Sequence, residues 1–115
     1  MLPSASRLRQ RSAFGRIYAK GRSYVTDLVV VYILPNKGHV TRIGFSVSKK
    51  LGNAVKRNRV KRLLREAARE MLPHISDGYD VVVVARNRAA GAVYGDVYAA
   101  LYGRLQKTGI LKARD

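Results

Sequence analysis

The chain has 115 residues, a length that fits one domain with a small hydrophobic core. Hydrophobic residues make up 47% of it, which excludes a disordered basic tail. The longest apolar run, residues 28–34, is far shorter than the ~20 residues that span a bilayer. Because there is no cysteine, disulfides, thiolate zinc sites and cysteine nucleophiles are excluded. Residues 1–10 contain arginines but no apolar stretch, so we expect a cytoplasmic protein without a secretory signal, membrane anchor or membrane partner.

Positive charge is the most prominent feature of the composition. The chain has 23 Lys and Arg residues against 7 Asp and Glu residues, a net charge of +16. Residues 1–65 carry 16 of the basic residues and a single acid, Asp27, whereas residues 66–115 carry 7 basic and 6 acidic residues. A surface charged only for solvation would mix both signs throughout, since self-repulsion at this charge destabilises the compact state. We therefore expect a polyanionic partner, bound mainly by the first half of the chain.

A short helix is predicted near the N-terminus, over residues 12–20. Ser12 is a suitable N-cap, and Gly21 follows where a left-handed C-cap is favoured. At helical spacing one side of this segment carries its large apolar side chains, which are Phe14, Ile17 and Tyr18.

Strands are predicted to follow this helix. The β-branched run 28–34 ends at Pro35, and residues 39–47 alternate in polarity. A Pro-Asn-Lys-Gly loop joins the two runs, so we expect them to pair as an antiparallel hairpin. Residues 22–26 form a brief pattern that can add an edge strand.

The most regular helical pattern lies in the middle of the chain. Asn53 is its predicted N-cap and Pro73 its predicted end. One face of this helix is apolar, with Val60, Leu63, Leu64, Ala67, Ala68 and Met71 at helical spacing.

The C-terminal third predicts one more strand and one more helix. Asp77-Gly78 is typical of a turn into a buried strand over residues 80–85, and residues 86–91 are expected to form a loop. A helix over residues 92–106 precedes a basic tail from about residue 107. With no repeat or linker, the element order predicts one α+β domain over residues 1–115, a two-layer sandwich of helices on a mixed sheet.

The polar face of the central helix predicts a binding surface. At about 100° per residue, its exposed side lies opposite the apolar face and carries Asn58, Arg62, Arg65 and Arg69, with Lys61 beside them. Like charges at this spacing repel by a few tenths of a kcal/mol each, so the arrangement favours an anionic partner. Arg57 and Arg59 add guanidinium groups that suit phosphates. Glu66 and Glu70 flank the row, and we expect Glu66 to pair with Arg62.

A specific resemblance narrows the class of partner. Residues 44–66, GFSVSKKLGNAVKRNRVKRLLRE, resemble almost letter for letter the signature of the bacterial ribonuclease P protein family. Phe14, Gly21, Tyr32 and the segment around Tyr79-Asp80 also lie where that family has them, so the resemblance covers about residues 7–106. The chain departs from the family at Tyr18, where phenylalanine is common.

The resemblance implies a role in removing the 5′ leader of precursor tRNA. It implies that the central helix binds a catalytic RNA through Arg57, Asn58, Arg59, Lys61, Arg62, Arg65 and Arg69. It implies a groove for the single-stranded leader that is formed by Phe14, Tyr18, Tyr32, Ser46, Ser48 and Lys49. It also implies a left-handed connection around the central helix, which is rare in other folds.

No residue pattern predicts catalysis by the protein itself. Protein nucleases use convergent carboxylates or histidine pairs, but His39 and His74 lie in different segments. The sequence Ser46 to Lys49 fits S-x-x-K and residues 107–109 spell K-T-G, but a β-lactamase needs a longer chain and an S-D-N element. The resemblance implies that the RNA performs Mg²⁺-dependent hydrolysis. We expect no small-molecule substrate, and the sequence names no protein side chain as a metal ligand.

Two other classes of protein are considered. A ribosomal or RNA-chaperone protein agrees equally well with the composition, and only the signature and the aromatic groove argue against it. A DNA-binding protein would need base-reading Asn or Gln along the exposed helix face, where only Asn58 qualifies.

Overall fold

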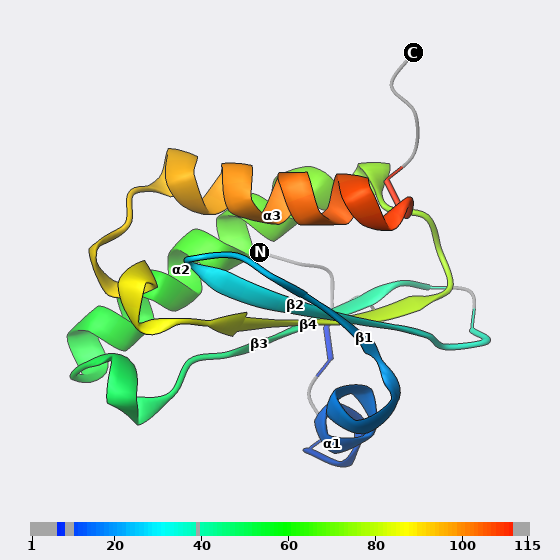
Figure 1. The fold of residues 1–115 in the computed structure, drawn as a ribbon, viewed down its shortest axis with the longest axis horizontal. Coiled ribbons are helices and arrows are strands. Elements are labelled where there is room, and N and C mark those ends of the chain that lie inside the picture. The colour runs from blue at the N-terminus through cyan, green and yellow to red at the C-terminus, as the bar shows by residue number, and fades with distance from the viewer. Residues whose placement is uncertain (1–6, 9–10, 39, 112–115) are drawn as a thin grey trace.

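The computed structural model describes residues 7–8, 11–38 and 40–111. The α-helices are α1 (Arg11–Lys20), α2 (Ala54–Met71) and α3 (Tyr94–Thr108), and the strands are β1 (Arg22–Val25), β2 (Val29–Pro35), β3 (Arg42–Ser46) and β4 (Tyr79–Ala85) (Figure 1). Turns of 3-10 helix cover Lys49–Leu51, Leu72–His74 and Asn87–Gly91, the last of them inside the predicted loop. The predicted element order, including the edge strand β1, is confirmed. Within the described residues no helix is both long enough and apolar enough to cross a bilayer.

The pairing of the strands differs from the prediction. The sheet order is β1-β2-β4-β3, so the expected hairpin between residues 28–34 and 39–47 is wrong. β4 lies between β2 and β3, antiparallel to the first and parallel to the second. The physical reason is the composition of β4, because Val81, Val82 and Val83 are buried on both faces of the sheet. Such a strand is most stable in the centre, whereas a hairpin would have left it at an edge.

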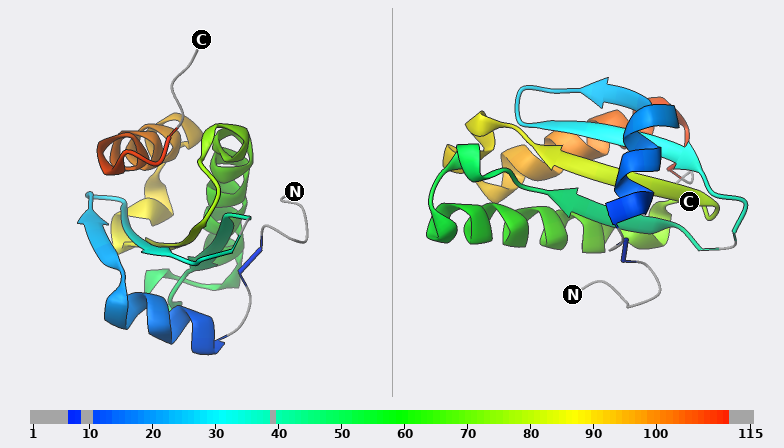
Figure 2. Two further views of the ribbon diagram at one scale, coloured as in Figure 1. Left: turned by 90° about the vertical axis from the view of Figure 1, so that its right-hand side faces the viewer. Right: turned by 90° about the horizontal axis from the view of Figure 1, so that it is seen from below.

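The sheet lies between α1 and the α2–α3 pair (Figure 2). It separates two hydrophobic clusters of unequal size. On one face α2 and α3 pack over alternate side chains such as Val31 and Val83. On the other face α1 covers only part of the sheet, with Ala13 and Ile17 against Val82. The predicted α+β fold with a mixed sheet is confirmed. Its two main layers are the sheet and the α2–α3 pair, and α1 adds a partial layer on the opposite face.

Helix α2 begins and ends as its sequence predicts. Asn53 is the N-cap, and its side-chain oxygen accepts a hydrogen bond of 3.0 Å from the Lys56 amide. The helix ends at Met71, just before Pro73. The apolar face points toward the core, with Leu63 half-buried and the other five predicted side chains buried.

The two ends of α1 differ from the prediction. The helix begins at Arg11, so Ser12 lies inside its first turn and is not the N-cap. Gly21 is not among the glycines with positive φ, so it is not a left-handed cap. Its lack of a side chain matters for another reason: an added Cβ would lie 2.6 Å from the Ile17 carbonyl oxygen and 3.0 Å from that of Ile33. Gly21 therefore allows α1 to approach β2 closely.

The C-terminal segment is held to the domain through residue 111. Lys107 lies in α3, and Gly109 caps this helix in the left-handed conformation with φ of 81°. Ile110 is buried, and its carbonyl accepts a 2.7 Å hydrogen bond from the Ser76 amide. Residue 107 therefore belongs to α3 and not to a tail, and residues 112–115 of the expected basic tail lie outside the described residues.

Helix α2 also connects the parallel strands β3 and β4. A parallel pair requires such a crossover, because the chain must return to the same end of the sheet. The left-handed sense implied by the resemblance stays a prediction.

Candidate nucleic-acid interface

The exposed face of α2 carries the predicted row of polar and basic side chains. Four members, Asn58, Arg62, Arg65 and Arg69, are exposed, and we call them the basic stripe. Lys61 beside them is half-buried. A shallow depression on this face is lined by Val55, Asn58, Lys61, Arg62 and Arg65. Among the described residues none of the stripe arginines forms an ion pair, which leaves their charges available to an anion.

Arg57 and Arg59 lie differently from the basic stripe. Arg59 donates hydrogen bonds of 3.2 and 2.7 Å to the carbonyl oxygens of Ala90 and Ala92. Its guanidinium therefore ties α2 to the turn Asn87–Gly91. Arg57 is half-buried, and its buried Nε has no hydrogen-bond partner within the described part of the chain.

The two acids of α2 do not neutralise the stripe. The expected ion pair between Glu66 and Arg62 is absent among the described residues, so that prediction is wrong. The acids instead influence α3. Burial raises the pKa of Tyr94, and the neighbouring Glu70 carboxylate, then Tyr98 and Glu66, raise it further. Both acids lie beside the stripe, on the edge of α2 that faces α3.

The three predicted groove aromatics meet on the other side of the sheet. The ring centroids of Phe14 and Tyr18 are 6.3 Å apart, and those of Tyr18 and Tyr32 are 5.0 Å apart, both edge-to-face. Tyr18 is 40% exposed, whereas Phe14 and Tyr32 are half-buried. Because a Cβ on Gly44 would lie 2.5 Å from Phe14 Cζ, the phenyl ring lies directly against β3. Phe14, Tyr18 and Tyr32 are the aromatic cluster from here on.

The three remaining predicted leader contacts lie along β3 and the turn after it. Ser46 is two residues beyond Gly44, so it faces the same side of the sheet as the aromatic cluster. Ser48 is exposed, and its hydroxyl caps the turn Lys49–Leu51 by accepting a 3.1 Å hydrogen bond from the Lys50 amide. Lys49 is exposed and adds positive charge at this end of β3.

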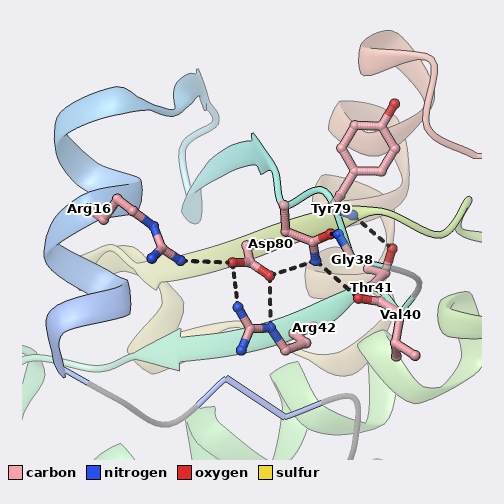
Figure 3. Close-up of polar contacts among 8 residues, drawn as sticks. Arg16, Gly38, Val40, Thr41, Arg42, Tyr79 and Asp80 are labelled. Atoms are coloured by element: carbon pink, nitrogen blue, oxygen red, sulfur yellow. Dashed lines mark hydrogen bonds and ion pairs between the residues drawn. The ribbon is translucent and has the colours of Figure 1, made fainter.

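A buried carboxylate near the aromatic cluster was not singled out by the sequence analysis. Asp80 has no exposed surface. Arg42 donates two hydrogen bonds to its carboxylate, from Nε to Oδ1 at 2.9 Å and from Nη2 to Oδ2 at 2.8 Å (Figure 3). Asn36 donates to Oδ1 at 3.0 Å, and Arg16 of α1 reaches Oδ2 at 3.3 Å. Burial raises the pKa of Asp80, but hydrogen bonds from Arg42 and Asn36 and the charges of Arg42 and Arg16 lower it more. The sequence did contain one indication of this buried carboxylate, because Asp80 is a single acidic residue directly before a run of four valines.

The described residues contain no group of three or more His, Asp or Glu side chains that could hold a metal ion. The surface chemistry of the described chain is instead cationic and aromatic. The basic stripe suits phosphates, and half-exposed rings suit unpaired bases. Fold and site together define a small basic α+β protein that binds nucleic acid.

Comparison with known proteins places the chain within that class. The family model for ribonuclease P matches residues 2–109. The ribonuclease P protein component of Clostridium botulinum (strain Loch Maree / Type A3) is 42% identical over 106 residues, which cover 91% of this chain and 96% of the relative.

Two solved structures share the fold. The RNase P protein of Staphylococcus aureus matches with a TM-score of 0.86 and 37% identity, over 95% of this chain and all of that one (100%). The Thermotoga maritima protein matches with a TM-score of 0.80 and 31% identity, over 88% and 96% of the two chains. The chain therefore belongs to the ribonuclease P protein family, whose members are components of the RNA-based enzyme that processes the 5′ end of tRNA.

Proposed function

We propose that this chain binds two RNA segments at once: the catalytic RNA through the basic stripe, and the 5′ leader of precursor tRNA through the aromatic cluster. The observation that carries the proposal is the position of the two surfaces, because α1 and α2 lie on opposite faces of one sheet (Figure 2). Residues 1–115 act as one RNA-binding domain, which the family match over residues 2–109 supports. The proposed location is the cytoplasm.

The aromatic cluster has the features of a site for single-stranded RNA. Base stacking on aromatic rings contributes about 1–3 kcal/mol per base and tolerates any sequence. Tyr18 exposes 40% of its surface, which leaves ring area for a base, and Tyr32 lies beside it on β2. Ser46, Ser48 and Lys49 extend the same side toward the end of β3, where Ser48 and Lys49 are exposed to a passing phosphate.

The basic stripe has the features of a site for a folded RNA. Its arginines are exposed, follow one line along an 18-residue helix and lack acidic partners among the described residues. Phosphates along the RNA backbone would relieve their mutual repulsion. Lys61 contributes from the edge of the stripe. Arg57 and Arg59 belong to the same proposed contact, although Arg59 already holds the carbonyls of Ala90 and Ala92.

Hydrolysis is assigned to the RNA, with Mg²⁺ held there. In this proposal the protein contributes binding. Contacts with leader and catalytic RNA together favour precursor over mature tRNA, since the second contact becomes intramolecular. The net charge of +16 also replaces part of the diffuse cations that the RNA needs to fold.

Cleavage assays on precursor tRNA test this division of labour. We expect highly purified protein alone to leave the precursor uncut. The catalytic RNA with protein should cleave at lower Mg²⁺ than the catalytic RNA alone. Metal-dependent cleavage by the protein without RNA, or an unchanged Mg²⁺ requirement, would contradict the proposal.

A further inference from the structure

The buried Asp80 links α1 to the sheet through Arg16, which projects from the side of the helix opposite Phe14 and Tyr18. At about 100° per residue, Arg16 lies about 160° from both Phe14 and Tyr18 around α1. Arg16 Nη2 reaches Asp80 Oδ2 at 3.3 Å, while Arg42 and Asn36 hold the carboxylate in place (Figure 3). The carboxylate is fully buried, whereas about half of the Arg16 side chain (49%) is exposed.

We infer that Asp80 and Arg16 are positioning residues, which fix α1 on the sheet and thereby set how the Tyr18 ring lies beside Tyr32, where a leader base would stack. This inference rests on the proposed leader site. Helix α1 has ten residues, too few for independent stability, and Ala13 and Ile17 are its buried side chains. The ion pair to the rigidly held carboxylate adds a directional contact that restricts how this short helix slides or rotates on the sheet.

The geometry of the aromatic cluster depends on that position. Tyr18 belongs to α1 and Tyr32 to β2, so their 5.0 Å centroid separation changes whenever α1 moves against the sheet. Misplacement of a binding group by about 1 Å is enough to weaken a site that depends on orientation. Loss of the Arg16–Asp80 pair should therefore weaken leader binding without removing any group that contacts the leader.

The test compares Arg16→Met with Lys20→Met, in complexes reconstituted with the catalytic RNA. Lys20 lies one turn further along α1, and no ion pair is formed by it among the described residues, so both variants lose one charge from the same helix. The measured quantity is the ratio of affinities for precursor and mature tRNA. We expect Arg16→Met to lower this ratio about three- to tenfold, and Lys20→Met to leave it unchanged. Arg16→Lys, which keeps the charge, should recover part of the ratio.

Two further measurements separate positioning from direct contact. If Arg16 acts through Asp80, Arg16→Met should lower the ratio no further in an Asp80→Asn background, and the salt dependence of binding should stay unchanged. Additive effects, or a salt slope reduced by about 0.7–0.9, would identify a direct phosphate contact and overturn the inference. An unchanged ratio in Arg16→Met would also overturn it.

Tyr18→Ala distinguishes failure of the inference from failure of the proposed function. If Tyr18→Ala lowers the ratio and Arg16→Met does not, the leader site stands and the positioning role is wrong. If neither lowers it, the leader does not bind at the aromatic cluster, and both proposals fail.

Discussion

Tyr18 is the side chain that separates leader binding from core packing most clearly. Phe14 contacts β3 at Gly44 and packs against the smaller hydrophobic cluster. Replacing a fully buried phenylalanine by alanine costs about 3–5 kcal/mol of folding stability, and we expect Phe14→Ala to lose part of that amount. Tyr18 is more exposed, so we expect Tyr18→Ala to lose about 1–3 kcal/mol of affinity for leader-bearing tRNA while its Tm stays close to wild type.

Tyr18→Phe is the matched control, since it keeps the ring and should bind the leader like wild type. Measuring the affinities for precursor and mature tRNA together with Tm distinguishes leader binding from core packing. Equal losses for precursor and mature tRNA in Tyr18→Ala would show that this ring does not contact the leader.

Asp80 makes stability depend on pH in a defined direction. Its pKa is lower in the folded protein than in the unfolded chain, so folding favours the ionised form. The resulting stability is present above the ordinary aspartate pKa of about 3.9 and is lost as the pH falls through the lower folded value. We expect Tm to fall as the pH drops below about 4, and Asp80→Asn to have a lower Tm at neutral pH with a weaker acid dependence.

Thermal unfolding between neutral and acidic pH measures this effect. Asp27→Asn is the control, because the Asp27–Arg88 pair is long, 3.8 Å, and highly exposed on both sides. That variant should keep the acid dependence of wild type. An Asp80→Asn variant with wild-type stability at pH 7 would show that the buried ion pair does not stabilise the fold.

At the scale of single elements, the salt dependence of RNA affinity tests the basic stripe. Arg62→Ala or Arg65→Ala should weaken binding to the catalytic RNA and reduce the log-log salt slope by about 0.7–0.9 for each phosphate that the variant no longer neutralises. Both side chains are exposed, so Tm should not change appreciably. Glu70→Ala, on the edge of α2 that faces α3, should affect RNA binding little. Unchanged slope and affinity in both arginine variants would exclude the stripe as the surface that binds the RNA.

The elements also show how far local sequence determines this structure. Helix α2 was predictable because its cap, apolar spacing and terminating proline all lie within the segment itself. The neighbours of β3 were not, because β4, more than thirty residues later, displaces it from β2. The outcome depends on which strand is stabilised most by burial on both faces. The residues of the loop between β2 and β3 carry no information about that competition.

The candidate site shows the same division. The basic stripe follows from helical periodicity, and the aromatic cluster from the resemblance. The partners of Asp80 come from β3, α1 and the loop after β2, so only the fold brings them together. The hydrogen bonds of Arg59 to Ala90 and Ala92 likewise depend on how α2 packs beside the turn after β4.

At the scale of the whole molecule, the sheet keeps the two proposed RNA-binding surfaces apart and in fixed relation. Helix α1, which carries Phe14 and Tyr18, and helix α2, which carries the basic stripe, lie on opposite faces of the sheet (Figure 2). One rigid domain can therefore hold the leader while it is anchored on the catalytic RNA. If the aromatic cluster binds the leader, as proposed, the gain in affinity applies only to a substrate that carries a leader.

The most direct test of binding to both RNA segments is the affinity of the catalytic RNA for precursor and for mature tRNA, each measured with and without the protein. We expect the protein to strengthen binding of the precursor and to leave binding of mature tRNA nearly unchanged. This increase in affinity should become smaller as the leader is shortened and should disappear when the leader is removed. An equal gain for both tRNAs would mean that the protein acts only as a diffuse positive charge, and would contradict a leader site on the protein.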